Sequence, residues 1–372
     1  MIFDSIHLQP VVEQFEIDGA FLEAIPHGSG HINETYLVHV QHNGERIDYI
    51  LQQINQYVFK NPTWISDNIR LTTDHMVRRK EQLGSNIITR QVLHTVPARD
   101  GRDYFIDKNG SFWRVATYID DAVSYDIIEN TDQAYQAARA FGEFQYMLSD
   151  LPTSELHEII PDFHNTPKRV DTFEAALEAD THNRAAGAKH AIEQALRYKE
   201  FSTQVEDDLA SGNIPLRTTH NDTKLNNVLL CKDDGKPVCV IDLDTVMPGS
   251  ILYDFGDMMR TSTCLTAEDE RNLEKIKVEM PIFDAIAQGY LSIAHNFLND
   301  REIDLLAFSG QLITYEIGVR FLTDHLQGDP YFKIHRDGHN LDRARAQFKL
   351  VESFTENEQK MRDILKNTLI AL

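Results

Sequence analysis

The apolar residues of this chain change their spacing near residue 120, and that change limits the folds it can adopt. Before it, short runs rich in Ile, Val, Leu and Tyr alternate with turn residues, a pattern typical of strands. Strands are predicted over residues 20–25, 32–40, 47–54, 87–96, 104–107 and 111–119. Tight turns such as Asn43-Gly44 favour antiparallel pairing. One helix is predicted over residues 63–83, so the first third predicts an antiparallel sheet with a helix.

Beyond the change, the apolar spacing is mostly helical. Helices are predicted over residues 131–148, 168–183, 189–208, 268–277, 282–298, 305–326 and 341–365. Thr131 is expected to cap the first of them. Polar residues over 215–230, followed by a short apolar strand, interrupt the helical run. We therefore expect an α+β fold with a sheet lobe over residues 1–119, a hinge over 120–124 and a mainly helical lobe over 125–372.

The overall charge limits the partners of the chain. Its 372 residues include 36 Lys plus Arg against 58 Asp plus Glu, a formal net charge of −22 at pH 7. Such an acidic chain repels phosphate backbones and anionic lipids, so we expect no nucleic-acid partner and no membrane docking. The sequence also gives no sign of an obligate protein partner. A small basic pocket is still compatible with this net charge.

The cysteines and the first residues indicate a cytoplasmic protein. The chain has three cysteines, Cys231, Cys239 and Cys264. Because their number is odd and their spacing fits neither a zinc site nor a C-x-x-C motif, we expect reduced thiols. Residues 1–14 lack a basic stretch followed by an apolar run, so no secretory signal is expected. No window approaches the roughly 18 consecutive apolar residues of a membrane helix.

One short polar motif carries most of the chemical information. Residues 220–227 read H-x-D-x-K-x-x-N, and phosphoryl transfer explains each residue type. Asp222 is suited to orient an attacking hydroxyl and accept its proton, and Lys224 to neutralise the transferred phosphate. Asn227 is suited to ligate Mg²⁺, and His220 to brace the loop through hydrogen bonds. The motif therefore predicts a kinase that uses ATP.

A second signal follows shortly after the first. The apolar run 238–241 ends at Asp242, where a second protein ligand to Mg²⁺ is expected, because Mg²⁺ prefers one or two carboxylates plus phosphate oxygens and water. Asp244 lies two residues further and would point the same way if the strand continued. A single Asp in a loop is usually a cap or turn residue. The two signals together favour phosphoryl transfer over that plainer interpretation.

These two motifs resemble those of the aminoglycoside and choline kinase superfamily, also called the phosphotransferase enzyme family. The resemblance covers nearly the whole chain. It implies a two-lobed, protein-kinase-like fold in which the N-terminal lobe binds the nucleotide and the helical lobe holds the catalytic and acceptor residues. The order of strands, hinge and helices predicted above agrees with that arrangement.

A narrower resemblance is to the N-acetylhexosamine 1-kinase branch of this family. It lies in THNDTKLNN at 219–227, IDLDTVMPG at 241–249, YDFGD at 253–257, GSGHIN at 28–33, RFLTDH at 320–325 and GDPYF at 328–332. The resemblance implies phosphorylation of the anomeric hydroxyl of N-acetylglucosamine or N-acetylgalactosamine. It also implies that Arg320 and Tyr331 bond the hydroxyl and acetamide groups of the sugar. An ion pair between Arg320 and Asp324, one helical turn apart, is the alternative.

The turn between the first two strands is a candidate phosphate site. Gly28, Ser29 and Gly30 would let backbone N–H groups approach phosphates, although most such turns only connect a hairpin. His31 follows and is predicted to reach phosphate or sugar, or else to lie in solvent. Tyr118, next to the hinge, is a candidate adenine contact or a core residue.

The sequence departs from the common kinase pattern at the third strand. Many kinases place there a lysine that holds the α- and β-phosphates, but residues 49–54 contain none. Gln52 or Gln53 occupies the place. A glutamine there brings no charge but can donate a hydrogen bond to phosphate, so Gln52 is a candidate nucleotide contact. Asp254 and Asp257 flank Phe255-Gly256, and we expect Asp257 to hydrogen-bond the catalytic loop.

Three alternatives remain open on the sequence. The first is a kinase of another small alcohol, such as an aminoglycoside, choline or homoserine. The second is a protein kinase, which the lack of an activation loop ending in Ala-Pro-Glu disfavours. The third is a silent pseudokinase that binds nucleotide without turnover. The missing lysine favours this third alternative, whereas the intact Asp222, Asn227 and Asp242 oppose it.

Overall fold

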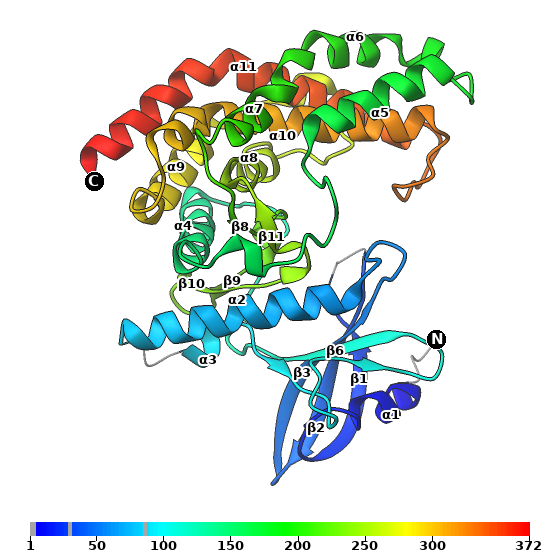
Figure 1. The fold of residues 1–372 in the computed structure, drawn as a ribbon, viewed down its shortest axis with the longest axis vertical. Helices are drawn as coiled ribbons and strands as arrows, with labels where there is room; N and C mark the ends of the chain where they lie inside the picture. The colour runs from blue at the N-terminus through cyan, green and yellow to red at the C-terminus, as the bar shows by residue number, and fades with distance from the viewer. Residues whose placement is uncertain (1–4, 29–31, 85–87) are drawn as a thin grey trace.

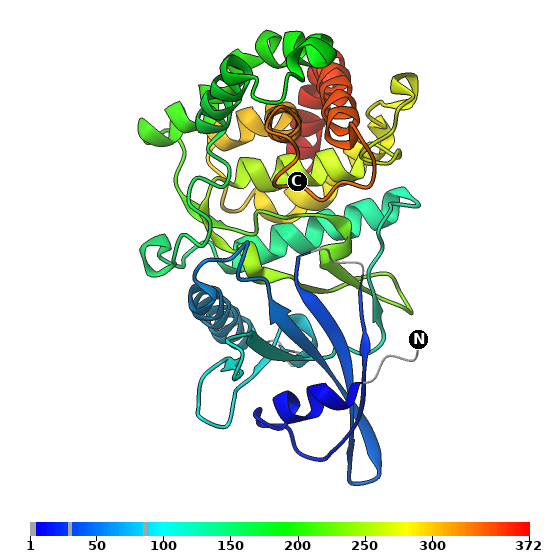
Figure 2. The ribbon, with the colours of Figure 1, turned by 90° about the vertical axis from the view of Figure 1, so that its right-hand side faces the viewer.

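The computed structural model describes residues 5–28, 32–84 and 88–372, and they form two lobes in chain order (Figures 1 and 2). The first lobe is an antiparallel sheet with the strand order β1-β2-β3-β6-β4, and β5 pairs with β6. Its strands are β1 (Ala20–Pro26), β2 (Glu34–His42), β3 (Glu45–Ile54), β4 (Thr95–Val96), β5 (Phe105–Ile106) and β6 (Phe112–Thr117). The prediction of an α+β fold with an antiparallel sheet and a helical C-terminal part is confirmed.

Alternation along the central strands gives the sheet two different faces. Leu51 of β3 and Val115 of β6 are buried in a core that includes Val12 of α1 (Gln9–Val12). Gln52 and Arg114 lie in register with each other on the opposite face of the same two strands. That opposite face is turned toward the helical lobe, which brings polar side chains of the sheet to the boundary between the lobes.

The long helix α2 (Pro62–Gln82) lies between the sheet and the helical lobe (Figure 1). Its buried side chains include apolar residues, such as Ile69, and polar ones. Asn68 donates to the backbone carbonyls of His157 and Val246, each at 2.8 Å. Because a buried amide must be satisfied, these bonds fix α2 against the segment that follows Asp242.

The second lobe is built from helices packed around a central one, α10. The helices are α4 (Thr131–Met147), α5 (Thr166–Ala179), α6 (Lys189–Arg197), α7 (Gln204–Ala210), α8 (Ile251–Ser262), α9 (Met280–Ala294), α10 (Asp300–Leu326) and α11 (His339–Ala371). A Cβ on Gly256 of α8 would lie 2.4 Å from the Ser309 carbonyl oxygen of α10. Glycine therefore permits the close contact between α8 and α10.

Two small sheets connect the lobes. One has the order β10-β9-β7 and the other pairs β11 with β8. The strands are β7 (Ala122–Val123), β8 (Arg217–Thr219), β9 (Val228–Cys231), β10 (Pro237–Val240) and β11 (Met247–Gly249). Because β7 belongs to the predicted hinge, the hinge pairs directly with the hairpin that leads to Asp242.

Several predicted elements differ from the structure. The described part of residues 87–96 forms a short helix, α3 (Ile88–Gln91), before β4 and is not a continuous strand. The predicted helix 268–277 is mostly irregular, because Ile276 and Val278 are buried alternately, as in an extended chain. The predicted helix 189–208 is divided into α6 and α7 by the 3-10 turn Lys199–Thr203.

The cap of α4 also differs from the prediction by one residue. Asn130 has extended backbone dihedrals, and its side chain accepts the N–H of Gln133 at 2.9 Å. Thr131 is instead the first helical residue. In the described part of the chain, no helix combines the length and the apolar character needed to cross a membrane.

Candidate active site

The segment between β8 and β9 is the centre of the site. Asn221 has a φ of 64°, a left-handed conformation that Asn tolerates better than most residues. Next to it, Asp222 Oδ2 lies 3.0 Å from Lys224 Nζ and accepts from Asn227 Nδ2 at 3.1 Å. The three side chains predicted to act in phosphoryl transfer therefore meet at one carboxylate.

The charge of Lys224 depends on this carboxylate. Burial lowers the pKa of Lys224, but the carboxylates of Asp222, Asp257 and Asp242 together outweigh burial and raise the net pKa above its ordinary value. The ammonium group is therefore charged at neutral pH. It is also partly exposed, so a phosphoryl group can approach it from solvent.

Asp254, at the start of α8, holds the backbone of the catalytic loop. Its carboxylate accepts the N–H of His220 at 2.9 Å, the N–H of Asn221 at 2.7 Å and Gln145 Nε2 at 2.7 Å. Its carbonyl accepts the Thr223 hydroxyl at 2.6 Å. A carboxylate at a helix N-terminus is electrostatically favoured, so α8 anchors the loop at several points.

The prediction that Asp257 holds the loop is therefore wrong. Asp257 lies one turn further along α8, and its Oδ1 pairs with Arg260 at 2.9 Å. Asp254, at the start of the helix, faces the loop instead. The sequence contains both aspartates, and only the direction of α8 distinguishes them.

His220 braces the loop from inside the protein. It is completely buried, its Nε2 lies 3.0 Å from the carbonyl oxygen of Ile241, and its Nδ1 lies 3.3 Å from the backbone nitrogen of Asp222. Phe141 and Phe144 pack edge-on against the ring. These contacts make His220 a positioning residue that links the catalytic loop to the strand before Asp242.

Asp242 follows β10 in a left-handed conformation with a φ of 59°. Burial and the carboxylates of Asp244 and Asp222 raise the pKa of Asp242 to about 6. The loop and this strand are joined because the Ile241 N–H donates to the Asn227 carbonyl at 2.9 Å. Asn227 and Asp242 are thus brought to the same side of the site, among carboxylates whose mutual repulsion a cation would relieve.

Asn227 and Asp242 are too few to hold a metal by protein side chains alone, but they suit Mg²⁺. In the ranges that the structure describes, no group of three or more His, Cys, Asp or Glu side chains has metal-binding geometry. Mg²⁺ needs only one or two carboxylates when phosphate oxygens and water complete its shell. The Asn227 amide nitrogen faces Asp222, which directs its carbonyl oxygen away from that carboxylate.

The strand that ends before Asp242 does not continue to Asp244, so the condition for the two side chains to point the same way is not met. A 3-10 turn over Leu243–Thr245 replaces the strand, so the two side chains do not share a strand face. Asp244 instead faces the sheet lobe. Its Oδ1 lies 2.5 Å from Nη1 of Arg114, and its Oδ2 accepts from Asn33 Nδ2 at 2.5 Å.

Arg114 is a functional candidate that sequence reasoning missed. Its Nε and Nη2 donate to Oε1 of Gln52 at 2.9 and 2.7 Å, while Gln52 Nε2 donates to the hydroxyl of Thr35 at 3.2 Å. Gln52, predicted to contact phosphate, therefore contacts a cation. No local sequence pattern marks this arginine, because only the register of β3 and β6 shows that residue 114 lies beside residue 52.

The predicted nucleotide contacts are only partly described. Gly28 has a φ of 80° with open space around it, whereas Ser29, Gly30 and His31 lie outside the described residues. Tyr118 ends the sheet lobe before the hinge, and its ring packs edge-on against His27 at 6.1 Å. It also lines a hollow of about 350 Å³ next to the hinge.

Arg320 and Tyr331 lie in one aromatic cluster. The Arg320 guanidinium lies over Phe163 and Phe332, at 5.4 and 5.8 Å from the ring centroids. Tyr331, which is exposed, packs edge-on against Phe332 at 4.8 Å. The two residues predicted to bind the acceptor are therefore brought together through Phe332.

The alternative pairing of Arg320 with Asp324 is not observed. Asp324 accepts the backbone N–H groups of Tyr331 and Phe332 at 2.8 and 2.9 Å, and so shapes the loop that carries Tyr331. Arg320 Nη1 instead lies 3.9 Å from Glu316, one turn back along α10. Asp324 therefore holds a loop, and Glu316 is the acidic neighbour of Arg320.

A buried polar chain connects this cluster to the catalytic loop. His164 Nδ1 lies 2.9 Å from Glu316, and its Nε2 lies 3.5 Å from the carbonyl oxygen of Asn221. The hydroxyl of Thr166 donates to Glu316 at 2.7 Å. His164 also stacks on Tyr253 at 4.9 Å. These contacts connect α10 to the loop that carries Asp222.

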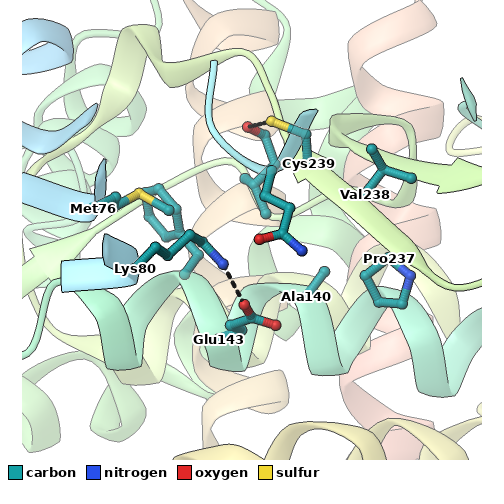
Figure 3. A pocket seen from close by; sticks show the side chains of 10 residues that line it. Met76, Lys80, Ala140, Glu143, Pro237, Val238 and Cys239 are labelled. Carbon is teal, nitrogen blue, oxygen red and sulfur yellow. Dashed lines mark hydrogen bonds and ion pairs between the residues drawn. The ribbon is translucent and has the colours of Figure 1, made fainter. Parts of the chain in front are cut away.

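A separate small cavity lies where α2 meets α4 and β10 (Figure 3). Lys80 and Glu143 form an ion pair of 2.6 Å there, and Cys239 lines the wall. The cavity measures about 40 Å³. That volume holds a few waters, so this cavity is too small for a nucleotide or a sugar.

The two-lobed fold and the loop with Asp222, Lys224 and Asn227 define the class of kinase-like phosphotransferases. The profile of the phosphotransferase enzyme family matches residues 23–278. Because this match covers more than half of the chain, the protein belongs to that family, as the sequence motifs predicted.

Solved structures share the fold at low sequence identity. A microcompartment-associated aminopropanol kinase superposes with a TM-score of 0.59 at 16% identity, covering 95% of this chain and 98% of its own. An aminoglycoside phosphotransferase from Alicyclobacillus acidocaldarius gives 0.57 at 13%, covering 98% and 96%. A spectinomycin phosphotransferase in complex with ADP and spectinomycin gives 0.53 at 12%, covering 97% and 100%.

Proposed function

We propose that this phosphotransferase uses ATP to phosphorylate the anomeric hydroxyl of N-acetylglucosamine or N-acetylgalactosamine, giving the sugar 1-phosphate. The observation that carries the proposal is the convergence of Lys224 and Asn227 on the carboxylate of Asp222. Kinase chemistry needs a carboxylate at the acceptor hydroxyl and a cation at the transferred phosphoryl group. The ADP complex of the spectinomycin phosphotransferase, which has the same fold, supports an adenine nucleotide as donor.

Each side chain has a defined task in a direct transfer. Asp222 orients the acceptor hydroxyl and takes its proton as the new bond forms. Lys224 stabilises the charge of the phosphoryl group from the exposed side of the same carboxylate. Asn227 and Asp242 would hold Mg²⁺, which neutralises phosphate charge when bound. Tyr118 places the adenine against the hinge.

The acceptor end favours a neutral sugar over an amine. Glu316 is fully buried and already accepts from His164 and Thr166. Arg320 and Arg169 both contact Phe163: the Arg320 guanidinium lies over its ring, and Arg169 Nη2 donates to its carbonyl at 2.9 Å. Two guanidinium groups repel an ammonium group and donate well to hydroxyl and acetamide oxygens.

An acceptor panel tests this proposal directly. ADP release from Mg-ATP would be measured with N-acetylglucosamine, N-acetylgalactosamine, glucose, galactose, choline, kanamycin and homoserine, and products identified by phosphorus NMR. We expect a sugar 1-phosphate from the N-acetylated sugars. Turnover restricted to choline, kanamycin or homoserine would contradict the acceptor and keep the chemistry. Nucleotide binding without any turnover would indicate a pseudokinase.

A further inference from the structure

The buried cation at the boundary between the lobes has no role in the mechanism above. Arg114 is 6% exposed and Asp244 is 3% exposed. Although Nη1 of Arg114 lies 2.5 Å from Oδ1 of Asp244, the two atoms meet off the line of a hydrogen bond. Both atoms are buried, and this ion pair leaves the N–H bonds of Nη1 poorly aligned with the carboxylate. A hydrogen bond weakens steeply when it is misaligned, so Nη1 is available to a better-placed acceptor.

The position of Arg114 follows from the strand register. Tyr49 lies opposite Thr117, and Gln52 lies opposite Arg114. Arg114 is therefore four residues before Tyr118 at the hinge, about 13 Å along the strand at roughly 3.3 Å per residue. It shares a sheet face with Ala116 of β6, because alternate residues of a strand point the same way. A nucleotide with its base at the hinge would extend its phosphates along this face toward Arg114.

Arg114 also lies near the expected metal ligand. Its guanidinium contacts Asp244, which follows Asp242 by two residues. The guanidinium is therefore next to the segment that carries the carboxylate expected to hold Mg²⁺. In that position it would meet the phosphate chain of a nucleotide.

We propose that Arg114, positioned by Gln52, binds the phosphates of the nucleotide and replaces the missing lysine of the third strand. This inference rests on the proposed use of ATP and does not depend on the acceptor. The cation has moved one strand across the sheet, from β3 to β6. Gln52 keeps the place of the lysine but fixes the guanidinium through two hydrogen bonds to one oxygen.

An arginine suits this displaced position better than a lysine. Its planar fork can donate Nε and Nη2 to Gln52 while Nη1 is directed at a different partner. Asp244 holds Nη1 in this structure, and Asn33 holds the other oxygen of Asp244. Phosphate oxygens would compete with that carboxylate for Nη1. The same residues thus connect nucleotide binding to the contact between the lobes.

The test compares nucleotides with and without phosphates. Calorimetry would measure the Kd of Mg-ADP and of adenosine for the wild type, Arg114→Gln, Arg114→Lys and the control Arg102→Gln. Arg102→Gln removes the same charge from the same lobe. The Arg102 side chain is exposed and donates to Asp100 in a turn. Circular dichroism would record the Tm of each protein without ligand.

We expect Arg114→Gln to weaken Mg-ADP binding about 10- to 100-fold, the range of a hydrogen bond to a charged group. Adenosine binding should be unchanged in every variant, and Arg114→Lys should recover part of the loss. Arg102→Gln should bind both like the wild type. If Arg114→Gln does not fold, the test relies on Arg114→Lys. This variant must still weaken the binding of Mg-ADP while leaving the binding of adenosine unchanged.

Two results would overturn the proposal. One is unchanged Mg-ADP affinity in folded Arg114→Gln. The other is an equal loss of adenosine and Mg-ADP affinity together with a lower Tm, which would make Arg114 only a clamp between the lobes. Because no acceptor is present in the experiment, a wrong sugar assignment would leave its outcome unaffected. If the wild type bound neither adenosine nor Mg-ADP, the proposed use of ATP itself would be refuted.

Discussion

The carboxylate of Asp254 accepts a hydrogen bond from the backbone N–H of Asn221 at 2.7 Å, although 33 residues separate the two in sequence. The same carboxylate accepts the N–H of His220. It therefore fixes two successive peptide groups immediately before Asp222. The accuracy with which Asp222 is placed depends on a residue that does not touch the reacting atoms.

The first prediction concerns Asp254→Asn, which keeps the shape of the side chain. Its amide NH₂ would face one of the backbone N–H groups that the carboxylate accepts in the wild type. Leaving a buried donor unpaired costs about 1–3 kcal/mol, so urea unfolding should show a loss of that size. The kcat should fall about 100-fold, since a small displacement near the chemistry has such effects. Asp257→Asn is the matched control on α8 and should reduce kcat less. Equal losses in both variants would contradict the anchoring role of Asp254.

The second prediction separates the base from the metal ligand. Asp222→Asn should lower kcat by about 10²–10⁴-fold, the usual contribution of a general base, and leave the Kd of Mg-ADP nearly unchanged. Asp242→Ala should weaken Mg-ADP binding and abolish its dependence on Mg²⁺. Calorimetry with and without EDTA distinguishes the two variants. Wild-type turnover by Asp222→Asn would refute the proposed mechanism.

The third prediction concerns Arg320. Arg320→Met keeps an unbranched apolar side chain at this position but removes the guanidinium that lies over Phe163 and Phe332. We expect the KM for the N-acetylated sugar to rise about 10-fold or more, as for the loss of one charged hydrogen bond, with the KM for ATP unchanged. Steady-state kinetics with each substrate varied in turn measures both. A rise in the KM for ATP alone would place Arg320 at the nucleotide instead.

The fourth prediction follows from Glu316. Burial raises the pKa of Glu316, but His164 and Arg320 outweigh burial and hold the net pKa below its ordinary value. An unfolded Glu takes up its proton near pH 4.3, at about its reference pKa. The stability from Glu316 is therefore complete above that pH and is lost as the pH falls through the folded-state pKa.

Urea unfolding across this acid range checks the sign. The free energy of unfolding of the wild type should fall more steeply with decreasing pH than that of Glu316→Gln. At pH 7 the variant should be less stable by about 1–3 kcal/mol, because a hydrogen-bonded buried charge is replaced by an amide. Glu178→Gln, an exposed position on α5, is the control. Parallel pH profiles for wild type and Glu316→Gln would contradict the inferred pKa.

The sequence predicted the parts of this site that lie close together along the chain. Asp222, Lys224 and Asn227 lie within six residues, so their meeting needs only one loop and one 3-10 turn. Asp242 ends the next apolar strand, and strand pairing returns it to the same loop. The order of sheet, hinge and helices was predictable for the same reason, since periodicity is a local property.

The parts that were missed depend on contacts between distant segments. Arg114 reaches the site only because β3 and β6 pair in one register and because the sheet packs over Asp244. The choice between Asp254 and Asp257 depends on the rotation of α8 about its axis. Residues 268–277 contain helical spacing, but the burial of Ile276 and Val278 overrides it. Tertiary packing decides such cases, and no local pattern records it.

The fifth prediction uses a thiol as a reporter of the junction between α2, α4 and β10. Burial raises the pKa of Cys239 to about 12, and its side chain lines the small cavity of Figure 3. Cys231 and Cys264 are partly exposed. At pH 8, Cys239 should react with a disulfide reagent about a thousandfold more slowly than a free thiol, because the reactive thiolate is scarce.

The variant Cys231→Ser/Cys264→Ser isolates this thiol for measurement. Its labelling should be slow in buffer and fast in urea, with a native circular dichroism spectrum before labelling. Addition of Mg-ADP should slow the labelling further if the nucleotide holds the two lobes together, because β10 leads directly to Asp242. Fast labelling of the folded variant in buffer would show that this junction opens readily, and would contradict the packing of α2 against the helical lobe described here.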